Sequence, residues 1–342
     1  MKKLVAGFLS LIMAVSLAAC SSTATASSTA ATGSAASTAA AAASSAAESK
    51  PLKLGVSVPN MTNVFFLQIK TAMEQEAVRT GSDEVIVMDA GGDQNKQMND
   101  VADMINQGCN IIALSPINST GVQATLEQCK DAGIPVICFN VGVDASSKPL
   151  VTSTIVSDNE GCGKLCADAL GEALGGKGNV VEVTFSTTTT CHNRQIGFEN
   201  EIAAKYPDIK ILQSKDVEKA TADYSQPVMV DFINANPDLN GVFCINDPTA
   251  RGAIAALKEA GKIDSVKVVS VDGSDEGKAF IRTGEMVASA AQQPSLIGSK
   301  TVDTAYDILD GKTVEADQII PVYIIDKTNV DAAASASPAA TK

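Results

Sequence analysis

The chain has 342 residues, of which 45% are hydrophobic and 19% are charged, and this composition is typical of a globular protein with one large or two medium domains. The formal net charge of -13 argues against a nucleic-acid partner, because binding to phosphates requires a basic surface. Only 4% of the residues are aromatic and Trp is absent, so the chain offers few flat apolar surfaces to a ligand.

The first twenty residues have the pattern of an export signal. Lys2 and Lys3 give a basic start, and an apolar run follows over 4–17 that is too short for a good membrane span. Small residues then precede Cys20, and this order resembles the bacterial lipobox, at which lipoproteins are processed. The resemblance implies a signal peptide over 1–19 and attachment of lipid to Cys20. The alternative is a plain secretory signal with a chance cysteine.

Two segments cannot form a packed core, because they consist almost wholly of small residues such as Ser, Thr and Ala. Residues 20–50 are predicted to be the lipidated cysteine and a flexible tether. Residues 331–342 are predicted to be a disordered tail. The folded part is therefore 51–330, and the lipid is expected to hold it on the outer side of the bacterial cell membrane.

Short apolar runs alternate with helical segments through the first half of the folded part. The predicted strands cover 52–58, 84–89, 110–115 and 135–140, and the predicted helices cover 65–80, 95–107 and 121–132. Gly81, Gly108 and Gly133 follow these helices, where helix C-caps belong. Continuous apolar strands between helices indicate a parallel sheet that is covered on both faces.

The same alternation begins again after Ser157. The predicted strands of this half cover 179–185, 209–212, 242–245, 266–271 and 287–291. The expected fold class is therefore α/β, with two doubly wound parallel-sheet lobes. Ligands of such sheets bind beyond the carboxyl ends of the strands, so functional residues are expected there.

The residues at these strand ends are amides, carboxylates and a few aromatics. They are Asn63, Phe65, Phe66, Asn140, His192, Asn246, Asp272 and Gln292. Carboxylate and amide groups can each engage two neighbouring hydroxyls, and an aromatic face can cover the apolar side of a sugar ring. No nucleophile–base pair stands among these positions. The pattern therefore favours binding of a neutral polyhydroxylated ligand over catalysis, and we do not expect an enzyme.

Several motifs occur in a fixed order between Leu52 and Val330. They are Asn63-Val64-Phe65-Phe66, Ser157-Asp158-Asn159 with Gly161 and Gly163, Arg194-Gln195-Ile196-Gly197-Phe198, Val242-Phe243-Cys244-Ile245-Asn246-Asp247, Val271-Asp272-Gly273, and Gln292 with Pro294 and Gly298. As an ordered set they resemble the ribose/galactose-type periplasmic-binding-protein family, the sugar receptors of ABC transporters.

The resemblance implies two lobes that are joined by a hinge and close around the ligand. It places three crossings between the lobes near Ser157, Gln292 and Pro321. The implied N-terminal lobe comprises 51–156 and 293–320, and the implied C-terminal lobe comprises 157–292 and 321–330.

The resemblance also implies roles for the strand-end residues. Phe65 would cover one face of the sugar ring and Phe66 would line the pocket. The ligand hydroxyls would be bound by Asn63, Asn246, Asp272 and Gln292. Arg194 matches a family arginine with a structural role.

Three positions depart from the ribose receptors of the family. Asn140-Val141 replaces an Asp-Arg pair, His192 replaces a ligand-binding Arg, and the aromatic expected near Ala220 is absent. Two bidentate guanidinium donors are thereby lost. We therefore expect a different hexose, pentose or polyol rather than ribose, with His192 donating to a ligand hydroxyl.

The sequence gives no sign of a metal or cofactor. Of 8 cysteines, the 7 beyond Cys20 are an odd number, and several fall within apparent strands and helices, where a free cysteine acts as a small hydrophobic residue. No second cysteine pair completes a zinc site with Cys162 and Cys166. The stretch 171–178 has the spacing of a phosphate-binding loop, but Gly178 stands where Ser or Thr is required, so a helix C-cap and turn are expected there.

The leading functional hypothesis is a monomeric transport receptor, which would capture a small sugar or polyol and dock on a membrane permease. The alternative is a sensory receptor that presents a sugar or furanose signal molecule to a chemoreceptor or kinase. Transcription regulators with the same lobe pair begin with a basic helix-turn-helix, but a signal and tether are predicted in that place.

Overall fold

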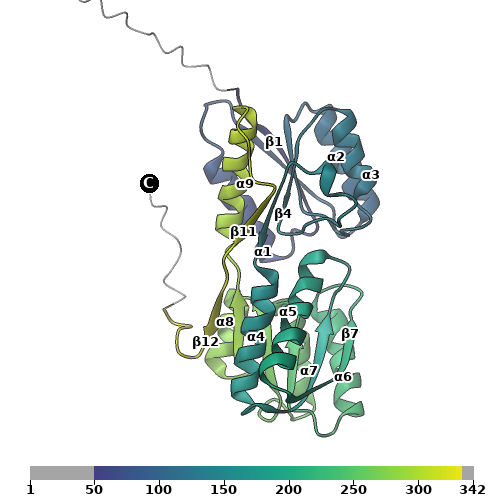
Figure 1. The fold of residues 1–342 in the computed structure, drawn as a ribbon, viewed down its shortest axis with the longest axis vertical. Coiled ribbons are helices and arrows are strands. Elements are labelled where there is room, and N and C mark those ends of the chain that lie inside the picture. Colours follow the sequence, from purple (N-terminus) through teal and green to yellow (C-terminus); the bar gives the residue numbers. More distant parts are fainter. Residues whose placement is uncertain (1–49, 333–342) are drawn as a thin grey trace, which may run out of the picture. The chain divides into compact units, whose positions relative to one another are not determined.

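The computed structural model describes residues 50–332, which form two α/β lobes with a six-stranded sheet in each (Figure 1). The strands of the first lobe follow the order β11-β5-β4-β3-β1-β2, and all are parallel. They are β1 (Lys53–Val58), β2 (Glu84–Asp89), β3 (Ile111–Leu114), β4 (Val136–Phe139), β5 (Ser153–Ser157) and β11 (Asp317–Ile320). The helices of this lobe are α1 (Val64–Glu76), α2 (Gln94–Asn106), α3 (Gln123–Asp131), the short η1 (Lys148–Leu150) and α9 (Pro294–Leu309).

The second lobe repeats this design. Its strand order is β12-β10-β9-β8-β6-β7, and only β12 runs antiparallel to its neighbour. The strands are β6 (Lys177–Thr184), β7 (Asp208–Asp216), β8 (Gly241–Cys244), β9 (Lys267–Asp272), β10 (Ala288–Ala291) and β12 (Tyr323–Asp326). The helices are α4 (Asn159–Ala173), α5 (Thr189–Lys205), α6 (Ala222–Ala235), α7 (Asp247–Glu259) and α8 (Asp275–Thr283). The expected α/β fold with two parallel-sheet lobes is confirmed.

The chain passes between the two sheets three times. It leaves β5 of the first sheet for α4, returns from β10 of the second sheet to α9, and passes from β11 to β12. The first two passages are short and begin at the carboxyl ends of parallel strands, Ser157 and Ala291. The residues just beyond these strands are therefore placed where the two lobes meet.

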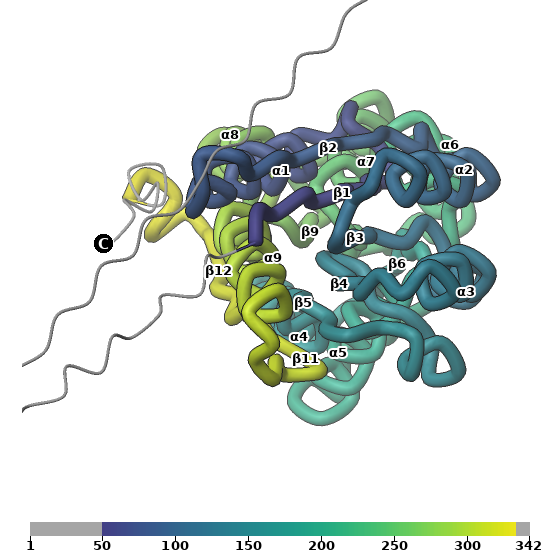
Figure 2. The backbone as a smooth tube through the Cα atoms, turned by 90° about the horizontal axis from the view of Figure 1, so that it is seen from above, coloured from purple at the N-terminus to yellow at the C-terminus, as the bar shows by residue number. Residues whose placement is uncertain are grey.

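Buried residues alternate between the two faces of each sheet, which explains the continuous apolar strands. In β3, Ile111 belongs to the core beneath α1 and α9, whereas Ile112 belongs to the core beneath α2 and α3. Figure 2 shows β1, β3 and β4 between these two helix pairs. In β8, Phe243 packs with the α4–α5 core and Val242 with the α6–α7 core. A strand that is covered on both faces needs apolar residues at successive positions.

The nine strands expected from the sequence are all present, and three further strands are not anticipated. β5, β11 and β12 are short, and they contain polar or exposed residues such as Ser153, Asp317 and Tyr323. β11 and β12 lie at sheet edges, where one side of the strand faces no neighbouring strand. These strands therefore lack the apolar signal of the central ones.

One helix end differs from the expectation. α1 ends at Glu76 with Ala77 as its C-cap, so Gly81 is not a cap and the expected helix over 65–80 is too long. Gly108 and Gly133 have positive φ just beyond α2 and α3, as expected. The backbone beyond Ala77 is instead engaged in tertiary hydrogen bonds, which override local helix propensity.

The structure shows the state of the cysteines, which the sequence leaves open, and it confirms the expected helix end and turn over 171–178. The seven cysteines within residues 50–332 are unpaired, and all except Cys191 are buried. α4 ends at Ala173, and Gly175 and Gly176 form a positive-φ turn before β6 begins at Lys177.

Several expectations concern segments outside the described residues. These are the signal peptide over 1–19, the lipid on Cys20, the tether up to residue 49 and the tail from residue 333. Within residues 50–332 no helix is both long and apolar enough to cross a bilayer.

Asp83 joins three segments at the amino ends of the first-lobe strands. Its carboxylate accepts hydrogen bonds from the backbone N–H of Leu52 at 2.7 Å, from Thr80, and from the hydroxyl of Tyr306 on α9 at 2.8 Å. The Tyr306 oxygen accepts from the N–H of Arg79 at 3.1 Å, and the Arg79 guanidinium lies 4.1 Å from the ring centroid. Burial raises the pKa of Asp83, but the hydrogen bonds to its carboxylate have the larger combined effect. The pKa of Asp83 is therefore lowered.

We expect Tyr306→Phe to lower the free energy of unfolding by about 1 kcal/mol at neutral pH, because it removes one hydrogen bond to a carboxylate. The folded-state pKa of Asp83 lies below its unfolded value, so its stabilisation is present above the unfolded pKa and is lost as the pH falls through the folded pKa. The difference between the proteins should therefore shrink below about pH 4. Urea unfolding across this pH range measures it, with Tyr323→Phe as an exposed control. An equal loss at acid and neutral pH would contradict the assigned role of the carboxylate.

Candidate functional site

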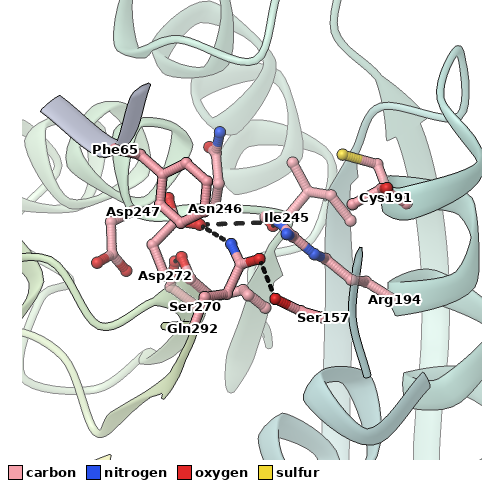
Figure 3. Close-up of polar contacts among 12 residues, drawn as sticks. Phe65, Ser157, Cys191, Arg194, Ile245, Asn246, Asp247, Ser270, Asp272 and Gln292 are labelled. Carbon is pink, nitrogen blue, oxygen red and sulfur yellow. Dashed lines mark hydrogen bonds and ion pairs between the residues drawn. The ribbon is translucent and has the colours of Figure 1, made fainter. Parts of the chain in front are cut away.

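The first lobe contributes Asn63 and two aromatic rings from the turn between β1 and α1. Asn63 is the N-cap of α1, and its side-chain oxygen accepts from the N–H of Phe65 at 3.0 Å. The rings of Phe65 and Phe66 meet edge to face, and their centroids are 5.8 Å apart. Phe66 is buried in the lobe core, whereas Phe65 is partly exposed, and Figure 3 shows its ring directed toward residues of the second lobe. Of the two rings, Phe65 is therefore the one that remains partly accessible, and its expected contact with a ligand stays a prediction.

Asn140 lies just beyond β4 with an unsatisfied buried acceptor. Its backbone has φ 60, a conformation that Asn tolerates better than most residues. It is 8% exposed, and its side-chain oxygen has no hydrogen-bond partner. Buried polar groups are nearly always paired, so this unpaired oxygen makes Asn140 a candidate for contact with a ligand.

The two lobes touch beside Asn140. Its backbone oxygen accepts from the hydroxyl of Thr190 on α5 at 2.8 Å. The Ser119 hydroxyl accepts from the N–H of Thr189 at 3.0 Å and donates to the Gly142 oxygen at 2.7 Å. The amino end of α5 is thus held against the loops that follow β3 and β4.

Asp272 ends β9 and brings a carboxyl group to the site. Its Oδ1 accepts from the side-chain amide of Gln292 at 2.7 Å and lies 3.8 Å from the Arg194 guanidinium (Figure 3). Burial raises the pKa of Asp272 to about 7, although the positive charge of Arg194 opposes the change. The nearby Asp247 adds to the increase. The carboxyl group is therefore a titratable hydrogen-bonding group at a lobe crossing.

Asn246 follows β8 and caps α7. Its side-chain oxygen accepts from the N–H of Thr249 at 2.9 Å, and its amide nitrogen donates to the Ala220 oxygen at 3.2 Å. The Thr249 hydroxyl completes a capping box. If Asn246 binds a ligand, the same side chain must also cap α7.

His192 lies apart from these residues. Thr190 and Arg194 are both buried and are four residues apart on α5, so they share one helix face. His192 is exposed, two residues from each, on the opposite side of the helix. Its expected hydrogen bond to a ligand hydroxyl stays a prediction.

Sequence reasoning treated Arg194 as structural, and the structure shows what it binds. The guanidinium is 3% exposed and donates to the side-chain oxygen of Asn159 at 3.0 Å and to the Ile245 oxygen at 3.1 Å. The motifs 157–159 and 194–198 gave the only sequence signal for this contact. Ser157 and Asn159 were not among the expected site residues, yet Asn159 contacts Arg194 and Ser157 contacts Gln292.

No group of three or more His, Cys, Asp or Glu side chains that could hold a metal ion occurs among residues 50–332. The cysteines nearest Arg194 are Cys162, Cys166 and Cys191, and burial raises the pKa of each thiol, which disfavours the thiolate form. The polar groups described above are amides, which donate and accept hydrogen bonds, and a carboxyl group, which accepts from Gln292.

Replacing Asn246 separates its structural role from any ligand role. We expect Asn246→Ala to lower the free energy of unfolding by about 1 kcal/mol, because the cap of α7 is lost. Asn246→Asp keeps the capping oxygen and should retain most of the stability. Urea unfolding without added solute measures both, with Asn234→Ala as an exposed control on α6. An alanine variant as stable as the wild type would show that the cap contributes nothing.

Residues 54–313 match the family model described as a periplasmic binding protein domain. The ribose import binding protein of Bacillus subtilis is 32% identical, and the alignment covers 78% of this chain and 84% of that protein. A xylitol-binding protein of Mycolicibacterium smegmatis is 29% identical over 82% of this chain and 79% of that protein.

Among solved structures, a solute-binding protein of an ABC transporter from Actinobacillus succinogenes with bound D-allose has a TM-score of 0.76. It is 25% identical, and the match covers 83% of this chain and all of that one. These similarities run through both lobes and confirm the resemblance seen in the motifs. The chain therefore belongs to the periplasmic binding protein family, among the type I sugar-binding proteins of ABC transporters.

Proposed function

We propose that this protein captures a small neutral sugar or polyol between its two lobes and delivers it to the permease of an ABC importer. The observation that carries the proposal is the pair of acceptors supplied by opposite lobes, the unpartnered oxygen of Asn140 and the carboxylate of Asp272. Both follow the carboxyl ends of parallel strands, where ligands of such sheets bind. A polyhydroxylated molecule can donate to both at once.

The charges around this position favour an uncharged ligand. Arg194 is engaged by Asn159, Ile245 and the ion pair to Asp272, so its guanidinium is not available to an anionic group. Val141 and His192 stand where ribose receptors of the family have arginines. A carboxylate at Asp272 would repel an acidic sugar, whereas it accepts well from hydroxyls. The proposed ligand is therefore a monosaccharide or polyol other than ribose.

Relatives of this chain are named for different solutes. The Bacillus subtilis relative is named for ribose and the Mycolicibacterium smegmatis relative for xylitol, and the Actinobacillus succinogenes structure holds D-allose. This range supports the class of ligand and leaves its identity to experiment.

The proposed location is the outer face of a bacterial membrane. The lipobox-like sequence before Cys20 supports a lipid anchor, and the Ser/Thr/Ala-rich segment that follows supports a tether between the anchor and the lobes. A monomer suffices for this role. A sensory receptor that docks on a chemoreceptor or kinase is the alternative, and it would use the same ligand site.

Thermal unfolding with a panel of solutes tests the proposal. The chain from Ser21 to Lys342, which lacks the lipid, is heated with D-ribose, D-allose, D-tagatose, D-galactose, myo-inositol or xylitol. A ligand at about 100 times its Kd adds about 2.7 kcal/mol to the free energy of unfolding, which shifts Tm by roughly 4–5 °C in a protein of this size. We expect one compound to give this shift and its stereoisomers to give none.

Asp272→Asn is the matched variant, because it removes the charge and keeps the shape of the side chain. We expect it to lose the shift caused by the active compound. A folded wild-type protein with no response to any of the six compounds would contradict the proposed ligand class.

A further inference from the structure

Four buried side chains and the partly buried Asp272 form a closed ring that runs through two of the crossings between the lobes. We call Ser157, Asn159, Arg194, Asp272 and Gln292 the buried ring. The Ser157 hydroxyl donates to Gln292 at 2.8 Å, and the Gln292 amide donates to Asp272 at 2.7 Å. The Asp272–Arg194 ion pair of 3.8 Å continues the ring (Figure 3). Arg194 donates to Asn159 at 3.0 Å, and Asn159 donates to the backbone oxygen of Ser157 at 2.9 Å, which closes it.

The members of the buried ring come from both lobes. Ser157 is the last residue of β5 in the first sheet, whereas Asp272 ends β9 in the second. Gln292 follows β10, where the chain begins to return to the first lobe. Ser157 is 2% exposed and Gln292 is 5% exposed, so water competes little for these hydrogen bonds.

The ring fixes the orientation of the Gln292 amide. An amide has an acceptor oxygen on one side and a donor nitrogen on the other. Because the Ser157 hydroxyl donates to the oxygen, the nitrogen faces Asp272 and donates to Oδ1. Without that hydroxyl the amide oxygen loses its donor, and the bond to Asp272 alone holds the amide in place.

We propose that Ser157 is a positioning residue of the binding site, which acts from the first crossing through Gln292 to hold Asp272 ready for a ligand. This proposal rests on the proposed function only in taking Asp272 as the ligand-binding group. The hydroxyl contacts no ligand itself. It ties the carboxylate to a residue of the other lobe, so that occupancy of the site and the conformation of the crossing affect each other.

The protonation of Asp272 gives a direct measure of this positioning. Burial raises its pKa, and the charge of Arg194 and the hydrogen bond from Gln292 lower it. The other titratable groups near it are Asp247 on α7, Cys162 on α4 and Cys191 on α5. Loss of the Gln292 donation removes an interaction that favours the carboxylate, so the pKa of Asp272 must rise.

The test compares Ser157→Ala with Ser153→Ala in protein without any solute. Ser153 is a matched control, because it is buried on the same strand and its hydroxyl donates at 2.7 Å to the Glu315 oxygen, outside the ring. NMR titration of ¹³C-labelled Asp carboxyl groups follows Asp272, whose signal is assigned from its loss in Asp272→Asn. We expect a raised titration midpoint in Ser157→Ala, an unchanged one in Ser153→Ala, and recovery in Ser157→Thr. An unchanged midpoint in Ser157→Ala, or an equal shift in both alanine variants, would overturn the proposal.

If Ser157→Ala does not fold, the wild-type protein still tests the orientation of the Gln292 amide on which the proposal depends. The side-chain N–H signals of Gln292 should shift with the midpoint of Asp272, because that nitrogen donates to the carboxylate. Side-chain N–H signals of Gln292 that do not change as Asp272 titrates would refute the assigned orientation.

A second arm applies the six-compound panel to the same variants. We expect Ser157→Ala to weaken binding of the active compound about ten-fold and Ser153→Ala to leave it unchanged. Equal weakening in both would overturn the positioning role. If the wild type binds none of the six, the proposed function fails, whereas the titration without solute still decides whether Ser157 positions Asp272.

Discussion

The proposed binding site depends on the carboxylate of Asp272, which is held at the end of a buried strand. Asp272 has φ 128, a conformation rare for a residue with a side chain, and Gly273 follows with φ 67. A Cβ on Gly273 would lie 2.4 Å from that of Ala291 on the adjacent strand, so only glycine fits. The close approach of β9 and β10 thus fixes the turn, and the turn directs the carboxylate toward Gln292 and Arg194.

Close packing of α4 against α5 brings Arg194 to this carboxylate. A Cβ on Gly163 would lie 2.0 Å from the backbone oxygen of Arg194, and one on Gly197 would lie 2.2 Å from that of Glu160. The two helices therefore touch backbone to backbone. Asn159, in the first turn of α4, can then reach the guanidinium. The glycines of these family motifs are therefore needed for the close contact between α4 and α5.

The sequence was sufficient for the layout of the fold, because the central parallel strands are mostly apolar. β3 at 111–114 and β8 at 241–244 fall within or beside the expected ranges, and the strand-end residues follow from the same pattern. The weakly apolar β5, β11 and β12 were not predictable, since tertiary pairing rather than local composition forms them. The roles of Asn63 and Asn246 as helix caps were not predicted from the sequence, which marked them only as strand-end residues. The buried ring joins residues as far as 135 positions apart, which local sequence patterns do not encode.

A crystal structure with the solute that most raises Tm would test the central claim most directly, that the two lobes bind one polyhydroxylated molecule through acceptors from both sides. The account predicts hydroxyls of that solute within hydrogen-bond distance of the Asn140 side-chain oxygen and the Asp272 carboxylate, with the ring of Phe65 against its apolar face. A solute bound to one lobe only, or at a position that leaves both acceptors unoccupied, would contradict it.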